Sequence, residues 1–482
     1  MIDFLIIGSG FAGAAMTIHL VEAGVDPKNI CVVGPTILGS GNAYGCKHED
    51  YRLNVRSEIM WIHPEKKNEF TNWAKKNTKD PLALHESGNF YRRADFAIFI
   101  HSKLEKILQK KQLIHKKNLV KKIYKEKDGL WVSILDNLEK LTSKNIILAT
   151  GNPAPKWPCH LEAKAMNQKD ALIENPWFGN WVNKINKKDK IVIIGSGLTA
   201  LDCLSALKSL RHKGQIILIS KSGKFPPIQA KWERKVNPNW PGENNQELLP
   251  STMIKFFKSY LPDSPPSTPK WQSAWEELRL DLNKHWDRIS NSGKIKLKNK
   301  LYSTWSRFRY RASPQTISAK EYFIKNNQIK LYKGHVKNIS LEGKGLFSCL
   351  FDGGKVIADK VINCSGKGND DLIKQIINDK IGVQDIFNET LKVDKNNKVI
   401  SVCTHIYIKR CTTHLAKTKN QNYELTLRDF FSGWTARTVC VVTGWWPFVS
   451  SSLGSPAGCG EPTPTASLGR MDLTRIFGST RR

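Results

Sequence analysis

Apolar residues in this chain fall into short runs, each followed by a glycine-rich loop and then by a helical pattern. Residues 2–7 predict a buried parallel strand, and residues 11–24 predict the helix that follows it. A second strand-loop-helix unit begins at Lys190, and its next strand covers residues 216–220. Alternating apolar positions over 118–136 predict a β-hairpin or meander. The pattern as a whole indicates an α/β fold built on two strand-loop-helix units.

Glycines at the first junction between strand and helix have the spacing of a dinucleotide-binding loop. Gly8 permits the tight turn after the strand, Gly10 lets the backbone approach a pyrophosphate, and Gly13 lets the helix pack closely on the strand. The helix N-terminus then offers N–H groups and a partial positive charge to the phosphates. The alternative is a glycine-rich turn without a ligand. The residues that we predict to bind a cofactor here are Gly8, Gly10, Phe11, Ala12 and Gly13.

The second junction repeats this spacing, with alanine as a permitted variant at the packing position. Two loops of this kind suggest a flavoprotein that also binds a nicotinamide cofactor. Lys221 follows the next strand, where a cation would suit a 2′-phosphate and would favour NADPH over NADH. An ordinary surface lysine is the alternative. The residues that we predict to bind the second dinucleotide are Gly195, Gly197, Leu198, Thr199, Ala200 and Lys221.

The first loop lacks one part of the usual pattern. An acidic residue normally ends the second strand and binds the ribose hydroxyls of the adenosine. Here the position after the strand is Gly34, and Pro35 follows it. Ribose binding must therefore use other groups or be weaker.

Composition adds a strong positive charge but no second class of site. The chain has 75 Lys and Arg against 43 Asp and Glu, a net charge of +32, and its lysines are spread along most of the sequence. This distribution favours a solvated basic surface with an anionic cofactor or substrate over a nucleic-acid site. The ten cysteines form no Cys-x-x-Cys pair and no zinc-type spacing, so we expect neither a redox motif nor a metal. No apolar run approaches the roughly 20 residues of a membrane span, and we expect a cytoplasmic location.

The order of these motifs, from residue 1 to about 400, resembles the FAD/NAD(P)-binding family that includes FAD-dependent urate hydroxylase-like proteins and is related to class B flavin monooxygenases. Beyond the two glycine loops, the matching segments are Gly39-Ser40-Gly41-Asn42-Ala43-Tyr44, Leu53-Asn54-Val55, Arg93, Ala149-Thr150-Gly151, Glu174-Asn175-Pro176-Trp177, Ser220-Lys221-Ser222-Gly223, Arg309-Tyr310-Arg311-Ala312-Ser313-Pro314 and Asn363-Cys364-Ser365-Gly366. The resemblance departs at Gly34 and in the flavin-closing segment after residue 400, which is not recognisable.

The resemblance implies two dinucleotide-binding domains of Rossmann type, one for FAD and one for NAD(P)H, with a mostly helical insert. The expected ranges are 1–155 for the first part of the FAD-binding domain, 156–328 for the NAD(P)H-binding domain including a Trp-rich insert at about 226–328, 329–400 for the return to the FAD-binding domain, and 401–482 for an atypical C-terminal tail.

The resemblance also implies an activity. NADPH, or NADH, would reduce the flavin, and the reduced flavin would react with molecular oxygen to give a C4a-hydroperoxide that hydroxylates a small nitrogenous or aromatic substrate. The rival interpretation is a nucleotide-binding protein with impaired or no catalysis, for which Gly34 and the unrecognised closing segment speak. A third, less favoured hypothesis is that the protein binds nucleic acid through its basic charge.

Further site residues follow from the same resemblance. It places Asn54 near the flavin edge, although a turn residue that caps its own backbone is an equal alternative. Arg309 and Arg311 would hold an anionic substrate or the nicotinamide phosphates, with a structural salt bridge as the rival for each. Asp202 is expected near the first helical turn of the second unit in a structural role. The additional cofactor-binding residues that the resemblance implies are Gly41, Tyr44, Thr150, Gly151 and Gly366.

Overall fold

The computed structural model describes residues 1–109, 112–233, 237–242, 246–385 and 391–392. These residues divide into two compact units, the first made of residues up to 229 and from 310 onward, the second of residues 230–309. The tail predicted at 401–482 and its flavin-closing segment lie outside the described residues. No helix in the described part of the chain combines the length and the apolar character needed to cross a bilayer.

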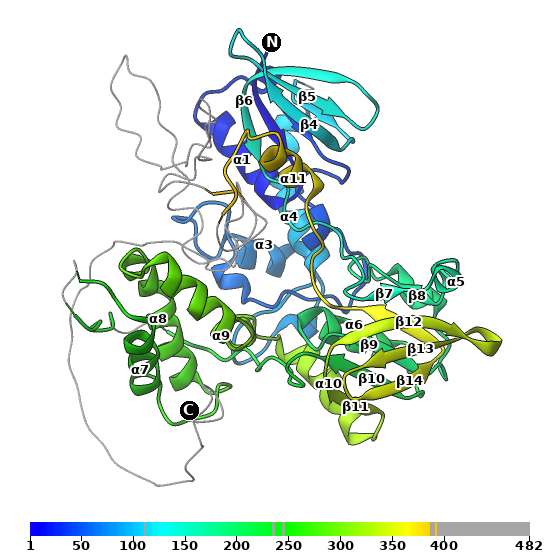
Figure 1. Ribbon diagram of the computed structural model, residues 1–482. Coiled ribbons are helices and arrows are strands. Elements are labelled where there is room, and N and C mark those ends of the chain that lie inside the picture. The colour runs from blue at the N-terminus through cyan, green and yellow to red at the C-terminus, as the bar shows by residue number, and fades with distance from the viewer. Residues whose placement is uncertain (110–111, 234–236, 243–245, 386–390, 393–482) are drawn as a thin grey trace. The chain divides into compact units, whose positions relative to one another are not determined.

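The first unit begins with a sheet in the order β3-β2-β1-β6-β5-β4, of which Figure 1 labels β6, β5 and β4. Strands β3, β2, β1 and β6 run parallel, and β5 and β4 continue the sheet as the predicted antiparallel hairpin. Helices α1 and α4 pack on each other and bury their apolar faces in the same core as β1 and β2. The bounds are β1 Ile2–Ile7, β2 Ile30–Val33, β3 Ile114–Lys116, β4 Val120–Lys125, β5 Trp131–Leu135, β6 Lys140–Leu148, α1 Phe11–Glu22, α2 Gly41–Tyr44, α3 Glu69–Asn77, α4 Arg93–Gln109 and α11 Asp371–Asn378.

A second sheet in the same unit has the order β11-β10-β9-β15-β8, and all its pairings are parallel. Its first four strands have the same order as β3, β2, β1 and β6, with β9 in the place of β1. The bounds of its strands and adjoining helices are β8 Leu172–Ile173, β9 Ile191–Ile194, β10 Ile216–Ser220, β11 Ile329–Lys333, β15 Lys360–Asn363, α5 Ala163–Met166, α6 Leu198–Ser209 and α10 Pro314–Lys325.

Both faces of this sheet are covered, which explains why its strands are apolar without alternation. Ile191 and Ile193 share a core with α6, and α10 packs against α6. Val192 and Ile194 point into the other core, which a third sheet covers (Figure 1). That third sheet has the order β14-β13-β12-β7, with bounds β7 His160–Leu161, β12 Val336–Glu342, β13 Leu346–Phe351 and β14 Gly354–Ala358.

The second unit contains the helices α7 (Pro250–Tyr260), α8 (Pro269–Trp286) and α9 (Asn291–Arg309). Its core is aromatic: Trp271 and Trp275 stack with ring centres 5.3 Å apart, and Trp275 lies 4.7 Å from Trp305. These rings are almost fully buried, so they form the core of the unit. The unit ends before residue 310, earlier than the insert expected at 226–328, because α10 packs against α6 in the first unit.

Candidate functional site

The two glycine loops occupy equivalent places in their sheets. The Gly8 amide donates a hydrogen bond to the Val33 carbonyl at the end of β2 (2.7 Å), and the Gly195 amide donates to the Ile219 carbonyl of β10 (2.8 Å). Each loop therefore leaves a central strand between two parallel neighbours. In doubly wound sheets, ligands bind at such carboxyl ends of parallel strands.

Two glycines of the first loop are required by the backbone. Gly8 has φ +126°, and a Cβ there would lie 2.0 Å from the carbonyl oxygen of Ala149, directly after β6. A Cβ on Gly13 would lie 2.0 Å from the carbonyl oxygen of Gly8. Both contacts are with backbone atoms that have no room to move. Glycine at these positions therefore maintains the turn and the packing of α1 on its strand.

Gly10 differs, because its side-chain direction is open. A Cβ there would meet nothing nearer than the Cα of Gly41, at 3.7 Å. Gly41 itself has φ +52°, and its Cβ would lie 2.7 Å from the Cα of Gly10, so the two backbones face each other without side chains. Gly10 also caps α1 without a side-chain hydrogen bond. The arrangement suits a pyrophosphate, which needs close backbone approach and uncapped N–H groups.

The place of the missing ribose acid is filled by a hydroxyl pair. A Cβ on Gly34 would lie 2.4 Å from the backbone nitrogen of Ser9 and 2.5 Å from its Oγ. Ser9 Oγ is 2.8 Å from Oγ1 of Thr36 and accepts a hydrogen bond from the Thr36 amide, while Thr36 Oγ1 accepts one from the Gly41 amide. Gly34 is therefore a packing requirement, and Ser9 and Thr36 place a pair of hydroxyl groups close to this strand end.

The second loop has the same division of roles. Gly195 has φ +113°, and its Cβ would lie 2.3 Å from the carbonyl oxygen of Cys364, whereas nothing lies within 4 Å of a Cβ on Gly197. Gly197 caps α6 without a side-chain hydrogen bond, and Leu198, Thr199 and Ala200 form the first helical residues. The predicted residues are thus brought together at a helix N-terminus that suits a second dinucleotide.

Asn54 lies in a bend between an isolated β-bridge at Arg52 and a 3-10 turn at Ser57–Ile59. The amide of Leu53 donates to the Tyr91 carbonyl (2.9 Å), and the amide of Ser57 donates to the Asn89 carbonyl (2.8 Å). Asn54 Oδ1 is buried and has no hydrogen-bond partner among the described residues. The structure therefore gives no support to the alternative in which Asn54 caps its own backbone.

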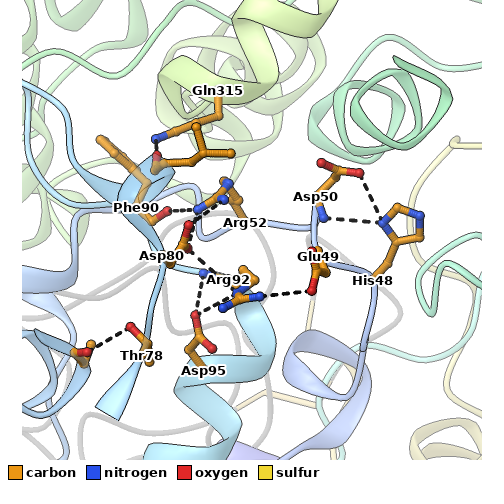
Figure 2. Close-up of polar contacts among 12 residues, drawn as sticks. His48, Glu49, Asp50, Arg52, Thr78, Asp80, Phe90, Arg92, Asp95 and Gln315 are labelled. Carbon is orange, nitrogen blue, oxygen red and sulfur yellow. Dashed lines mark hydrogen bonds and ion pairs between the residues drawn. The ribbon is translucent and has the colours of Figure 1, made fainter. Parts of the chain in front are cut away.

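A buried ion pair involves Arg52, two positions before Asn54 in the sequence, and Figure 2 shows its contacts. Arg52 donates to both carboxylate oxygens of Asp80, at 2.7 and 2.9 Å, and to the carbonyl of Phe90 at 3.0 Å. Both side chains of the pair are nearly inaccessible to solvent. Bidentate geometry of this kind holds orientation as well as position. Arg92 extends the network to Asp95 at 3.3 Å.

Sequence reasoning missed a second set of contacts, which joins the two nucleotide-binding regions of the first unit. Arg93 Nη2 donates to Oδ2 of Asp202 on α6 at 2.5 Å, and Tyr51 donates its hydroxyl proton to the carbonyl of Pro176 at 2.8 Å. Burial raises the pKa of Asp202 to about 6, against the opposing effect of Arg93. Asp202 thus forms a buried ion pair with Arg93, a contact that the expectation based on the helix dipole did not include.

The remaining predicted residues have these places. Tyr44 ends α2, and its ring packs against Phe96 with ring centres 4.9 Å apart. Arg309 is the last residue of α9, Arg311 follows two positions later, and both side chains are buried. In the first unit, Thr150 and Gly151 follow β6, Gly366 follows β15 with φ +113°, and the exposed Lys221 follows β10.

Residues 5–153 match the family model described as FAD-NAD(P)-binding. The matched segment contains the first glycine loop, the Ser9–Thr36 pair and Asn54. The match thus assigns this part of the chain to a FAD/NAD(P)-binding domain. No curated protein sequence matches the chain.

Two solved structures share the fold. One is the ornithine N-hydroxylase of Kutzneria sp. 744, solved with reduced FAD, NADP+ and L-ornithine. It is 12% identical to this chain, with a TM-score of 0.53, and the match covers 83% of this chain and 89% of that chain. The other is the FAD-bound cadaverine monooxygenase of the desferrioxamine pathway of Erwinia amylovora, with 13% identity, a TM-score of 0.53 and coverage of 83% and 86%. At this identity the likeness establishes the fold, and the expected FAD/NAD(P)-binding α/β architecture is confirmed.

Proposed function

We propose that this protein is a FAD-dependent, NAD(P)H-using monooxygenase that hydroxylates a small nitrogenous or aromatic substrate. The observation that carries the proposal is the pair of equivalent glycine loops, each with one unobstructed glycine at an uncapped helix N-terminus. One such loop serves one dinucleotide. Two in a single unit suit an enzyme that takes electrons from a nicotinamide and passes them to a flavin.

In this proposal the first loop holds FAD. The N–H groups of Phe11, Ala12 and Gly13 face the pyrophosphate, and the Gly10–Gly41 contact leaves room for it. When bound, FAD supplies the hydride-accepting and oxygen-activating chemistry. Further residues that we assign to this site are Tyr44, Asn54, Thr150 and Gly151.

Asn54 is the residue that we assign to the flavin edge. Its buried Oδ1 lacks a partner among the described residues, and such an atom costs free energy unless a ligand or water satisfies it. The Arg52–Asp80 pair beside it fixes the backbone and so limits where the amide can point. The role of Asn54 would be to orient the cofactor and to keep one hydrogen bond at its edge.

The second loop holds the nicotinamide cofactor in the same proposal. Gly197, Leu198 and Thr199 present the N-terminus of α6 to its phosphates, and Gly366 lies at the end of the neighbouring strand β15. Lys221 is exposed directly after β10, where its charge would favour NADPH through the 2′-phosphate. Arg311 and Arg309 remain candidates for an anionic substrate or phosphate.

Two substrate classes are the first to test. The two solved structures named above are an ornithine N-hydroxylase and a cadaverine monooxygenase, and this favours a primary amine as the substrate. The resemblance to urate hydroxylase-like proteins favours a nitrogen-containing aromatic ring. Substrate-dependent oxidation of NADPH, with hydroxylated product identified by mass spectrometry, separates the two classes.

A matched set of glycine variants tests the cofactor roles. Gly10→Ala and Gly197→Ala add a methyl group where no protein atom obstructs it, so both variants should fold. We expect G10A to lose FAD, and we expect G197A to keep FAD but to lose anaerobic flavin reduction by NADPH. Gly343→Ala, also without atoms within 4 Å of the added carbon, is the control and should keep both functions. Wild-type protein that stays colourless after incubation with FAD would refute the proposal.

The rival function is nucleotide binding without turnover, and Gly34 is the observation that favours it. Gly34 stands where such loops usually have an acidic residue, so no carboxylate at this position can bind the ribose hydroxyls. Under this alternative the purified protein binds FAD and NADPH in titrations, yet added substrates change neither the rate of NADPH oxidation nor the products. A product formed with any substrate would exclude it.

A further inference from the structure

Two histidines and a glutamate meet at the end of α1, away from its glycine loop. His19 and Glu22 lie one turn apart on the helix, and His63 comes from the loop after Ile62. His63 Nε2 is 2.8 and 3.1 Å from the two oxygens of Glu22, and His19 Nδ1 is 3.4 Å from Oε2. One ligand atom from each residue lies within 4.8 Å of the others.

The orientation of His19 favours Nδ1 as a metal ligand. Its other ring nitrogen, Nε2, lies 3.4 Å from the carbonyl oxygen of Ile62. A ring nitrogen that donates to a backbone carbonyl carries the proton, which leaves the opposite nitrogen as the lone-pair donor. Metal-binding histidines are usually oriented by such a second contact. The contact here points Nδ1 toward Glu22.

Burial and access also suit a bound ion. His19 and His63 are 4% and 8% exposed, whereas the Glu22 side chain is half exposed. The two imidazole rings lie 4.7 Å apart and meet edge to face. The histidines are therefore held by the surrounding protein, and an ion can enter from the side of the carboxylate.

We propose that His19, Glu22 and His63 bind one divalent transition metal ion, with Zn²⁺ as the ion to test. Zinc binds imidazole nitrogen and carboxylate oxygen at about 2.0–2.2 Å, so tetrahedral ligand atoms lie about 3.3–3.5 Å apart. His19 Nδ1 lies 3.4 Å from Glu22 Oε2, which matches that separation. His63 Nε2 lies 2.8 Å from the same oxygen, a hydrogen-bond distance, so a bound ion would replace the proton between them and widen this contact by about 0.5 Å. Three protein ligands leave a fourth position for water. The ion would tie the end of α1 to the loop at residues 60–63, independently of any FAD or NADPH binding.

Zinc titration of the full chain, stripped of metal with a chelator, tests the proposal by calorimetry and thermal unfolding. Glu22→Gln is the main variant, because the half-exposed side chain can change without disturbing the core. His335→Gln is the matched control, since His335 Nδ1 also faces a carboxylate, Asp352 Oδ2, at 3.1 Å but belongs to no three-residue cluster among the described residues.

We expect the wild type to bind one Zn²⁺ more than E22Q, or to bind it at least about tenfold more tightly. We also expect zinc to raise the unfolding temperature of the wild type and of H335Q but not that of E22Q. His63→Gln should behave like E22Q. Equal zinc affinity and stoichiometry in wild type and E22Q, or an equal loss in H335Q, would overturn the proposal.

Discussion

Replacing Gly34 by aspartate puts back the acid that dinucleotide-binding loops usually carry, and we expect it to weaken FAD binding. The expectation opposes the one from sequence alone, in which the carboxylate would restore contacts to the ribose hydroxyls. The reason is steric. The first carbon of any side chain at Gly34 would lie 2.4 Å from the Ser9 backbone nitrogen and 2.7 Å from the Ser9 Cβ.

The magnitude follows from those distances. Unbonded carbon atoms rest at about 3.5–4.0 Å, so the Gly34 Cβ requires the Ser9 backbone to move by roughly 1 Å. That backbone belongs to the glycine loop itself. Overpacking of this kind costs about 1–3 kcal/mol of folding stability. Because the loop can relieve this strain by leaving the position that binds FAD, holding it there on binding costs up to the same free energy, which raises the dissociation constant for FAD by about 5- to 150-fold. A carboxylate that reached the ribose would return about 1.5–3 kcal/mol through charge-assisted hydrogen bonds, but only if the loop kept its place.

Fluorescence titration of apoprotein with FAD measures the effect in wild type, G34A and G34D. We expect both variants to bind FAD more weakly and to a similar degree, because both carry the obstructing Cβ. Ser9→Gly should not rescue G34D, since the nearest atom is a backbone nitrogen. The steric reasoning is refuted if G34D binds FAD more tightly than the wild type, or far more tightly than G34A.

Three further predictions concern stability. Arg93→Met leaves the Asp202 carboxylate buried without its counter-charge, so the free energy of unfolding, measured with denaturant, should fall by about 3–5 kcal/mol. The double variant R93M/D202N should recover part of this loss, and no recovery would contradict the pairing. Because burial raises the pKa of Asp202 to about 6, the folded state holds a proton that the unfolded state releases, and the stability of wild type relative to D202N should fall by up to about 3 kcal/mol as the pH rises from 4 to 6. A flat difference would refute it. Trp271→Ala removes a ring that stacks on Trp275 and whose centre lies 4.8 Å from that of Phe308. Denaturant unfolding followed by near-ultraviolet circular dichroism should show a free energy of unfolding of the second unit lower by about 3–5 kcal/mol. An unchanged unfolding transition would exclude a core role for Trp271.

Local patterns were enough to predict much of the fold. The strands at residues 2–7 and 216–220 lie where the apolar runs indicate them. Each run is bounded by a glycine or turn that ends it, and burial on both faces makes the signal continuous. The glycine loops were found for the same reason, because every requirement at Gly8 and Gly13 arises from backbone atoms in a fixed local geometry.

Contacts between distant residues could not be predicted in this way. Arg93 meets Asp202 across 109 positions of sequence, and His63 meets Glu22 across 41. Neither pair has a spacing that marks it, since the approach depends on how whole elements pack. The expectation of no metal was argued from cysteine spacing, whereas His19 looks like an ordinary core residue on α1, so no sequence pattern grouped it with Glu22 and His63.

The serine between the glycines changes how the missing ribose acid should be interpreted. In the first loop Ser9 Oγ lies 2.8 Å from Thr36 Oγ1, shortly after β2; in the second, Ser196 Oγ donates to Ser220 Oγ, the last residue of β10, at 2.8 Å. Both halves thus close the end of the second strand with the same hydroxyl contact, and neither places an acid there. In the second half the absence of an acid also agrees with Lys221, which directly follows β10. The two loops are therefore closed by similar hydroxyl contacts, and the glycine at position 34 is explained by the space that Ser9 occupies rather than by decay of the loop.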